Sequence, residues 1–331
     1  MQQLNSEIVG TPAALPRDWD ARASVVRAMA VNHTQRTLQM LFETLMVSLV
    51  LYLADLWVIA HAASWIHWPL AAAQGFWIQR CYCVGHEAAH GKLLPGRPLT
   101  NDILGQLALF ALLTPLPIFR KIHRFHHGHN RRDWTTSALE VSVLERDSQW
   151  GRFTAWCRWL LAVFAAGWFW HGLLSILLFL CLPVARAQSI SPAFRGWTLR
   201  ERGLSWLGFA LGLSIHWGVG LTLGFQRWLQ WLGTPLLFFA WIYSAQLYIY
   251  HYDTPVGPEV TRHARSLGGR LVGWWLLNLN EHATHHLRPA IVWYALRTAA
   301  RQTGAELNRS WLWGIANQLR GPRIVIRTEK A

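Results

Sequence analysis

Three short stretches of this 331-residue sequence are rich in histidine, and their spacing suits metal ligands. They are HEAAH at 86–90, HRFHH at 123–127 and HATHH at 282–286. On a helix, residues three and four positions apart lie on one face, so each stretch can present its imidazoles together. The eight histidines are His86, His90, His123, His126, His127, His282, His285 and His286.

Neutral imidazole is a common nitrogen ligand for zinc, iron, copper and nickel. One metal ion takes about four to six ligands, so eight histidines are too many for one ion and suit two. We therefore predict a site for two metal ions, built from all three stretches. The other histidines stand alone, and we expect interfacial or structural roles for His33, His61, His67, His129, His171, His216 and His263.

The first stretch also fits a different kind of enzyme. HEAAH matches the HExxH helix of zinc hydrolases, in which Glu87 would act as the general base. Such a membrane protease needs only one further ligand and would leave the other six histidines without a role. A metal transporter or haem carrier is another alternative, but its ligands should lie at mid-bilayer within the spans. Here the histidine stretches lie outside the apolar runs, which disfavours that class.

The composition predicts a membrane protein. Hydrophobic residues make up 52% of the chain and charged residues only 15%, whereas a typical soluble domain has about 25% charged residues. The 22 tryptophans agree, because tryptophan gathers at bilayer interfaces. The formal net charge of +14 comes from basic residues that flank the apolar runs. We interpret this charge as a signal of membrane orientation and expect no nucleic-acid partner.

Long apolar runs must position the histidines, and one helical span needs about 20 such residues. We predict four spans in two hairpins, at about 41–60 with 65–84 and at 203–225 with 231–250. The links within each pair are only a few residues long, which implies antiparallel neighbours. The second helix continues into the first histidine stretch, and we expect Arg80 to reach the interface there.

Two further apolar runs are expected to lie in the interface. The run 103–119 is interrupted by Pro115 and Pro117, and the run 155–182 carries basic residues. If neither crosses, an even number of spans separates the histidine stretches, so all three reach the same face. Arginines accumulate on that face, and the positive-inside rule then places the site and both termini in the cytoplasm. We expect the membrane to be a bacterial inner membrane.

The predicted fold class is therefore an all-α integral membrane protein. It has four transmembrane helices in two hairpins, interfacial helices and a cytoplasmic helical cap that holds the metals. Along the chain we expect a cytoplasmic N-terminal segment at 1–36, the membrane domain at 37–300 and a basic cytoplasmic C-terminal tail at 301–331.

The sequence around the histidines resembles the membrane fatty acid desaturase superfamily. GHEAAHG at 85–91 looks like the first histidine box of that family, and NLNEHATHHLRP at 278–289 looks like the third. Many members place an additional histidine ligand where YHYD ends the last span, so His251 is a ninth expected ligand. The resemblance covers roughly residues 40–300.

The resemblance implies a non-haem di-iron oxidase, with two iron ions (Fe2+/Fe3+) as cofactors and O2 as co-substrate. It implies a fatty acid or lipid acyl chain as substrate, and desaturation is the commonest reaction of the family. A lipid hydroxylase and a fatty acid decarboxylase that forms terminal alkenes remain alternatives on the same scaffold. The chain has no cytochrome b5 signature, so electrons are expected from a separate ferredoxin, rubredoxin or cytochrome b5-type donor.

Side chains near the histidines are expected to support the site. An imidazole that binds metal usually donates its other N–H to an oxygen nearby. The candidates for this role are Glu87, Asp133, Asp253, Asn278 and Glu281.

Other side chains are expected to meet the substrate, the donor or the membrane. Three arginines beside the second stretch either contact a phosphate, a carboxylate or an acidic donor, or belong to the basic belt of the membrane surface. They are Arg120, Arg131 and Arg132. Candidate walls of a slot for the acyl chain are Trp217, Trp241 and Tyr248.

Overall fold

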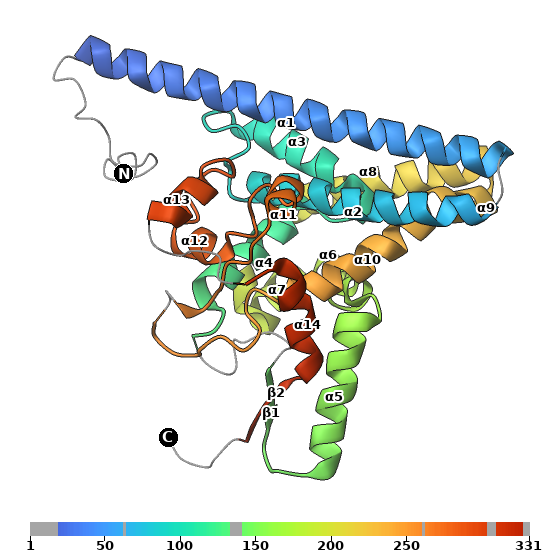
Figure 1. The fold of residues 1–331 in the computed structure, drawn as a ribbon, viewed down its shortest axis with the longest axis vertical. Coiled ribbons are helices and arrows are strands. Elements are labelled where there is room, and N and C mark those ends of the chain that lie inside the picture. Colours follow the sequence, from blue (N-terminus) through green and yellow to red (C-terminus); the bar gives the residue numbers. More distant parts are fainter. Residues whose placement is uncertain (1–18, 62–63, 133–140, 260–261, 303–308, 327–331) are drawn as a thin grey trace.

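The computed structural model describes residues 19–61, 64–132, 141–259, 262–302 and 309–326, and its regular structure is nearly all helical (Figure 1). The first part of the chain forms α1 (Trp19–His61), α2 (Ser64–Ala89), α3 (Pro98–Leu109), the 3₁₀ turn η1 (Phe110–Leu112) and α4 (Leu116–His129). The predicted helical class is therefore confirmed. The span expected at 41–60 is the second half of a longer helix, because α1 already begins at Trp19.

The middle of the chain contains two π-helical segments, in which the helix is locally widened. Its elements are β1 (Val141–Leu144), α5 (Gln149–Phe164), the π-helix η2 (Trp168–Leu173), α6 (Leu174–Cys181), α7 (Val184–Ile190), the 3₁₀ turn η3 (Pro192–Phe194), α8 (Leu199–Leu223), α9 (Phe225–Trp228), the π-helix η4 (Leu229–Gly233) and α10 (Thr234–Leu247). The run expected to span at 231–250 therefore begins in a π-helix and ends in turns.

The C-terminal part consists of short elements. They are α11 (Arg270–Trp275), α12 (His282–Leu287), α13 (Leu296–Gln302), α14 (Trp311–Asn317), the 3₁₀ turn η6 (Gln318–Arg320) and β2 (Arg323–Ile326). β2 pairs in parallel with β1, with Val141 opposite Arg323 and Leu144 opposite Ile326. The hydroxyl of Tyr252 donates to the carbonyl of Gly321 at 2.7 Å. Residues 309–326, from the segment expected to be a tail, thus pack against the rest of the molecule.

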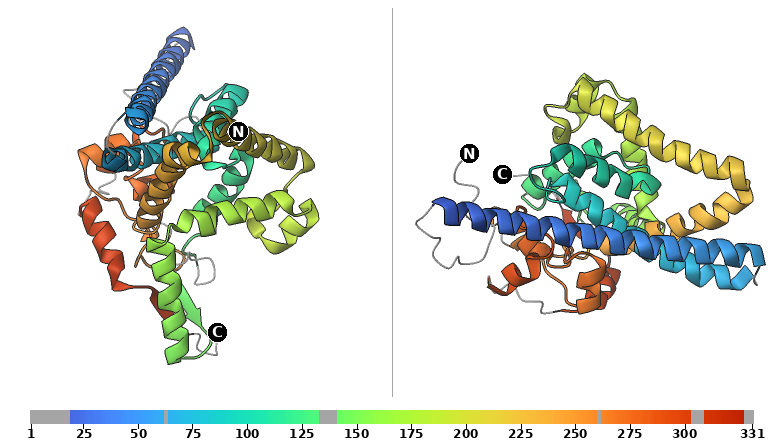
Figure 2. Two further views of the ribbon diagram at one scale, coloured as in Figure 1. Left: turned by 90° about the vertical axis from the view of Figure 1, so that its right-hand side faces the viewer. Right: turned by 90° about the horizontal axis from the view of Figure 1, so that it is seen from above.

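The long helices form two neighbouring hairpins, as Figures 1 and 2 show: α1 lies along α2, and α8 leads through α9 into α10. The C-terminal end of α1, the N-terminal end of α2 and α9 lie at the same end of the bundle. Near that end, Nε1 of Trp231 donates to the carbonyl of Tyr52 at 2.8 Å and ties the hairpins together. α4 and α12 lie toward the opposite end, so the histidine stretches gather away from α9.

Two of the described helices are long and apolar enough to cross a membrane. They are residues Asn32–His61 of α1, with a mean hydropathy of 1.8, and α8, with 1.3. α2 is not one of them, because it carries polar side chains that turn inward, including the buried Gln74, Gln79 and Arg80. The predicted four spans are thus supported only in part, by two apolar helices and by the paired hairpins.

Both runs that were expected to lie in the interface bend by about a right angle. The helix of α3 and η1 meets α4 at 94°, and α5 meets the helix of η2 and α6 at 98°. At the bends, Leu113 and Ala166 have left-handed backbones, with φ of 49° and 52°. By shape, each pair is a broken span or a re-entrant loop, so neither run forms one straight segment.

Arg80 does not reach the interface as expected, because its side chain is buried inside the bundle. Its Nε donates to Oγ1 of Thr44 at 3.1 Å, and its guanidinium also bonds the carbonyl of Trp274 and pairs with Glu43 at 3.3 Å. A buried guanidinium needs such partners. Arg80 therefore anchors the second half of α2 to α1 and α11, beside the first histidine stretch.

Candidate metal centre

The first histidine box lies at the C-terminal end of α2. The ring centroids of His86 and His90 are 4.9 Å apart, as residues four positions apart on a helix should be. Gly85 lets this end of α2 approach α3 closely, because a Cβ there would lie 2.4 Å from the side chain of Leu109. Gly91 has a left-handed φ of 71°, which ends the helix just after His90.

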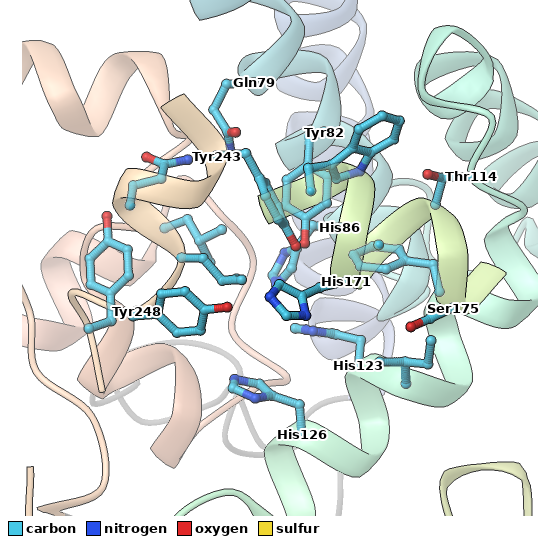
Figure 3. Close-up of a pocket in the computed structure, with 18 of the residues that line it drawn as sticks. Gln79, Tyr82, His86, Thr114, His123, His126, His171, Ser175, Tyr243 and Tyr248 are labelled. Atoms are coloured by element: carbon cyan, nitrogen blue, oxygen red, sulfur yellow. The ribbon is translucent and has the colours of Figure 1, made fainter. Parts of the chain in front are cut away.

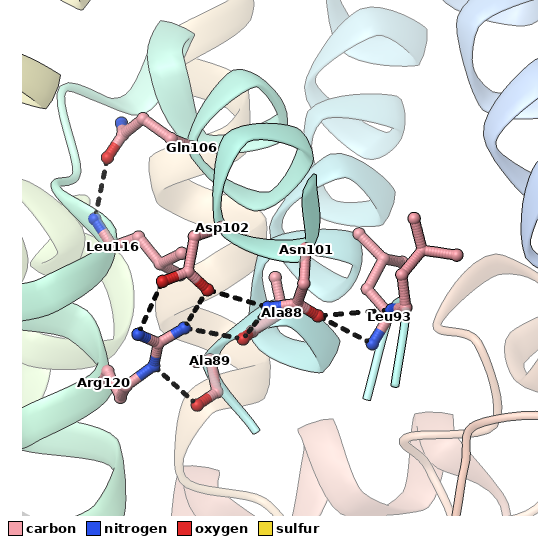
Figure 4. A network of polar contacts seen from close by, with 9 residues as sticks. Ala88, Ala89, Leu93, Asn101, Asp102, Gln106, Leu116 and Arg120 are labelled. Atoms are coloured by element: carbon pink, nitrogen blue, oxygen red, sulfur yellow. Dashed lines mark hydrogen bonds and ion pairs between the residues drawn. The ribbon is translucent and has the colours of Figure 1, made fainter. Parts of the chain in front are cut away.

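The second box lies on α4, which is bonded to the end of α2 (Figure 4). Arg120 of α4 donates to the carbonyls of Ala88 and Ala89 at 3.1 and 3.0 Å and pairs with Asp102 of α3. Asn101 also donates to the carbonyl of Ala88, at 2.9 Å. Carbonyls at a helix C-terminus lack partners within the helix, so these bonds fix the first box relative to the second. The guanidinium of Arg120 thus bonds groups of the protein itself, and the two roles expected for it from the sequence stay predictions.

The third box forms the short helix α12, which follows a sharp reversal of the chain. Leu277 and Asn278 have left-handed backbones, with φ of 54° and 56°, which residues other than glycine rarely adopt. Nδ2 of Asn278 donates to the carbonyl of Trp293 at 3.2 Å. Asn278 therefore fixes the loop, and among the described residues it bonds no box histidine. The reversal buries His282, His285 and His286.

His251 reaches the boxes from the turns that follow α10. Its Nε2 lies 3.1 Å from Nε2 of His282, and its Nδ1 lies 2.8 Å from the carbonyl oxygen of His263. A carbonyl only accepts, so Nδ1 carries the proton and Nε2 is the nitrogen that can bind a metal. Metal-binding imidazoles are commonly oriented in this way by a backbone carbonyl. The sequence did not reveal this partner, because a main-chain oxygen has no residue-type signal.

The nine histidines divide into two groups. Within each group, one ring nitrogen of every histidine lies within 4.8 Å of one ring nitrogen of every other member. We call them the five-histidine and four-histidine groups. The five-histidine group is His86, His90, His123, His127 and His285. The four-histidine group is His126, His251, His282 and His286. Boxes two and three contribute to both groups. In each box, the two histidines that are four positions apart belong to the same group (His123 with His127, and His282 with His286). The histidine between them, His126 or His285, belongs to the other group.

Ring nitrogens within each group converge at short distances. Nε2 of His123 lies 2.8 Å from that of His90 and 3.0 Å from that of His127. In the other group, Nε2 of His126 lies 3.1 Å from that of His286. Two nitrogens that each lie about 2.1 Å from a shared ion at a right angle are about 3 Å apart. The spacing therefore suits one ion in each group.

The electrostatics of the site also suit metal ligands, which must be neutral imidazoles. Burial lowers the pKa of all nine histidines, to about 4 for His126 and about 2 for His127. Nε2 of His86 and both ring nitrogens of His285 are buried without a hydrogen-bond partner in the part of the chain that the structure describes. Such orphaned atoms are uncommon in proteins, so the donor set fits two bound metal ions.

Of the described side chains expected to be oxygen partners of the imidazoles, only Glu87 pairs with a box histidine. The carboxylate of Glu87 is 3.5 Å from Nδ1 of His86 and pairs with Lys92 at 3.4 Å. Nζ of Lys92 also donates to the carbonyl of Ile291 at 2.7 Å. The buried pair thus connects the first box to the loop after the third.

The other expected carboxylates do not bond the imidazoles within the described structure. Asp253 is exposed and pairs instead with Arg323 at 2.8 Å. Glu281 is buried, which raises its pKa to about 7, but no hydrogen bond joins its carboxylate to a described histidine. Asp133 lies outside the described residues.

A mainly apolar cavity of about 400 Å³ opens onto both histidine groups (Figure 3). It is lined by His86 and His123 of the five-histidine group and by His126, His251 and His282 of the other. The remaining walls come from α2, α4, η2, α6, α10 and the segments beside them. A concave space with apolar walls and a few polar groups is typical of a ligand site, and this one suits an extended apolar chain.

Only one of the three walls expected from the sequence, Tyr248, lines the cavity. Trp217 and Trp241 are 68% and 53% exposed and do not line this cavity. His171 of η2, for which we expected an interfacial or structural role, lines the cavity beside the boxes (Figure 3). A single histidine has no spacing pattern, so only the fold reveals its position.

Comparisons with known proteins identify the family of this chain. Residues 63–313 match the fatty acid desaturase family. The chain is 26% identical to a chloroplastic omega-3 fatty acid desaturase of Glycine max, over 72% of this chain and 54% of that protein. It is 34% identical to a chloroplastic temperature-sensitive sn-2 acyl-lipid omega-3 desaturase (ferredoxin) of Arabidopsis thaliana, over 29% of this chain and 24% of that protein.

An endoplasmic reticulum acyl-lipid omega-3 desaturase (cytochrome b5) of Arabidopsis thaliana is 28% identical, over 41% of this chain and 35% of that protein. The chain thus spans about half of these relatives' length or less. The family match nevertheless covers most of this chain and includes all three histidine boxes and His251. The chain therefore belongs to the fatty acid desaturase family.

Proposed function

We propose that this protein is an O2-dependent fatty acyl desaturase whose nine histidines hold two iron ions. The observation that carries the proposal is the gathering of nine buried or half-buried imidazoles into two groups beside one apolar cavity. Four or five nitrogen ligands satisfy most of the coordination of each ion. The choice of iron rests on the family, because imidazole ligation suits several metals.

When bound, the two irons supply the redox chemistry with O2 that removes hydrogen from an unactivated methylene, which zinc cannot. The chain itself holds the substrate. Ile118, Phe119 and Trp168 are among the apolar walls that exclude water and keep an acyl chain beside His86 and His123. Methylenes offer no polar group for recognition, so the length and bend of the cavity select which carbons lie at the histidines.

The names of the relatives favour desaturation over the other reactions of this scaffold, because all three described above are omega-3 desaturases. Desaturation removes hydrogen from two adjacent carbons, so both must stay next to the metal pair. The cavity meets histidines of both groups along one side, which suits holding two neighbouring carbons in place. Hydroxylation and decarboxylation are distinguished from desaturation by the product.

The position of Glu87 argues against the zinc hydrolase alternative. This carboxylate is 2% exposed, and the backbone N–H of Trp293 donates to it at 3.2 Å. It also pairs with Lys92, and it is not among the described residues that line the cavity. A general base must reach a water molecule beside the metal, whereas Glu87 is placed to support His86.

The proposal includes a multi-pass arrangement with four spans, in which the boxes and both termini face the cytoplasm of a bacterial cell. Its support is that the adjoining ends of α1 and α2 lie with α9 at one end of the bundle, and that α4 and α12 lie toward the other. Electrons come from a separate donor of the ferredoxin, rubredoxin or cytochrome b5 type. The names of two relatives mention ferredoxin and cytochrome b5. The boundaries at 1–36, 37–300 and 301–331 stay predictions.

Lipid profiling of expressing cells by mass spectrometry tests the function. Cells with the wild-type protein should gain an unsaturated acyl species that requires O2, and His285→Ala should abolish it. His129→Ala is the matched control, because this exposed histidine follows the second box on α4 and belongs to neither group. A hydroxylated lipid or a shortened terminal alkene would reject desaturation and keep the metal site. Purified protein with one zinc and no iron would reject both.

A further inference from the structure

His251 is held differently from the other eight histidines. The others lie on α2, α4 and α12 or directly at the end of one, whereas His251 lies in the turns after α10. Helix periodicity therefore does not determine where its imidazole points. Tertiary contacts must do so, and the structure shows which residues make them.

Arg131 makes the longest-range of these contacts, from just beyond the end of α4. It is fully buried, and its guanidinium donates to the backbone carbonyl of His251. Its own carbonyl accepts from the N–H of Gly257 at 3.0 Å. Its backbone is left-handed, with φ of 64°, a conformation that persists in a residue with a side chain only where the surroundings enforce it. Arg131 thus holds the segment from His251 to Gly257 at both ends.

Local bonds complete the hold on the turn. The hydroxyl of Thr254 contacts the carbonyls of His251 and His263, at 2.7 and 3.0 Å. Nδ1 of His251 donates to the same carbonyl of His263. Arg265 donates to the carbonyl of the residue after His251. A backbone carbonyl therefore orients the imidazole of His251 through Nδ1. Arg131 and Thr254 in turn orient the backbone of the turn.

We propose that Arg131 is a positioning residue that sets the metal affinity of the four-histidine group without touching the metal. The inference rests on the proposed di-iron centre. The bond from Arg131 keeps the His251 turn in the orientation that points Nε2 at His282. The five-histidine group has no member in this turn, so its affinity does not depend on Arg131. The two metal sites share α4 and α12, and only the four-histidine group includes a residue of this turn.

Iron binding, measured apart from turnover, tests this role. Wild-type, Arg131→Ala and Arg132→Ala proteins are purified in detergent, stripped of metal and titrated anaerobically with Fe2+ against a competing chelator. We expect Arg131→Ala to weaken one of the two iron equivalents by about 10-fold to 100-fold, the usual effect of losing an outer contact of a metal ligand. The other equivalent should bind as in the wild type. Arg132 is the matched control because it is the adjacent arginine and is exposed.

Two further variants sharpen the experiment. His251→Ala identifies the affected equivalent, since it removes a ligand of the four-histidine group itself. Thr254→Val removes the hydroxyl contacts to the carbonyls of His251 and His263 with little change in volume, so it should weaken the same equivalent by a smaller factor. Thr254→Val also decides the question if Arg131→Ala does not fold: a variant that then binds both equivalents as the wild type does would reject the inference.

The outcomes separate this inference from the proposed function. Unchanged binding of both equivalents in Arg131→Ala would overturn the positioning role. Equal weakening of both would also overturn it, because that result indicates a general contribution to folding. Wild-type protein that binds fewer than two irons would contradict the di-iron centre itself, whatever the variants do.

Discussion

The two histidine groups of this protein are built by different means. Four members of the five-histidine group come as pairs spaced by one helical turn, His86 with His90 and His123 with His127, and Arg120 bonds the two helices that carry them. The four-histidine group depends on His251, which lies in turns. Helical spacing is maintained by local hydrogen bonds, whereas a turn of this kind is maintained by contacts with distant residues. The five-histidine group should therefore keep its geometry better than the four-histidine group when metal or supporting contacts are removed.

The largest effect should come from replacing, one at a time, two neighbouring histidines of α4 that belong to different groups. His126→Ala and His127→Ala should each abolish product formation, because each removes a proposed metal ligand. Iron titration should then show that the two variants lose different equivalents. Loss of the same equivalent in both would break the division into two groups.

Removal of iron should affect the two halves unequally. A metal at 100 times its dissociation constant stabilises the folded state by about 2.7 kcal/mol per site, and chelation removes that contribution. Hydrogen exchange followed by mass spectrometry should show that residues 248–254 lose protection before residues 84–90 do. The comparison fails if both segments lose protection together, or if the end of α2 opens first.

Loss of the link between α2 and α4 should have an intermediate effect. Arg120→Ala removes bonds to two helix-end carbonyls and to Asp102. Hydrogen bonds of charged groups contribute about 1.5–3 kcal/mol. The side chain of Arg120 is 21% exposed, so we expect a loss of about 1–2 kcal/mol from the free energy of unfolding. Thermal unfolding in detergent measures it, with the exposed Arg124→Ala on the same helix as control. Equal shifts in both variants would argue against the link.

The smallest effect concerns the cavity. A Cβ at Gly172 would lie 2.9 Å from Cδ1 of Trp168, and both residues line the cavity. Gly172→Val should push the indole into the cavity and shift the product profile toward shorter acyl chains. Gly218→Val is the control, because a Cβ there meets no atom within 4 Å. Trp217→Ala, on the exposed face, should leave the profile unchanged. A profile that responds to Trp217 and not to Gly172 would place the substrate elsewhere.

The sequence by itself determined the helical class, the paired hairpins and the nine histidines that the fold brings together. These features could be predicted because they depend on local patterns. Apolar runs of span length and ligands spaced by three or four residues follow directly from helix geometry. The resemblance of YHYD to the family added His251, which local spacing does not indicate.

Only the tertiary structure decided how the histidines are divided and what holds them. His285 joins histidines of boxes one and two, whereas His282 and His286 join His251. This division depends on how α2, α4 and α12 cross. The inward roles of Arg120 and Arg131, the carbonyl partner of His251 and the exposure of Trp217 depend on contacts between residues far apart in the chain. An arginine beside a histidine box has the same local pattern whether it faces the membrane surface or a buried carbonyl. Its partner is set by packing, which no short stretch of sequence records.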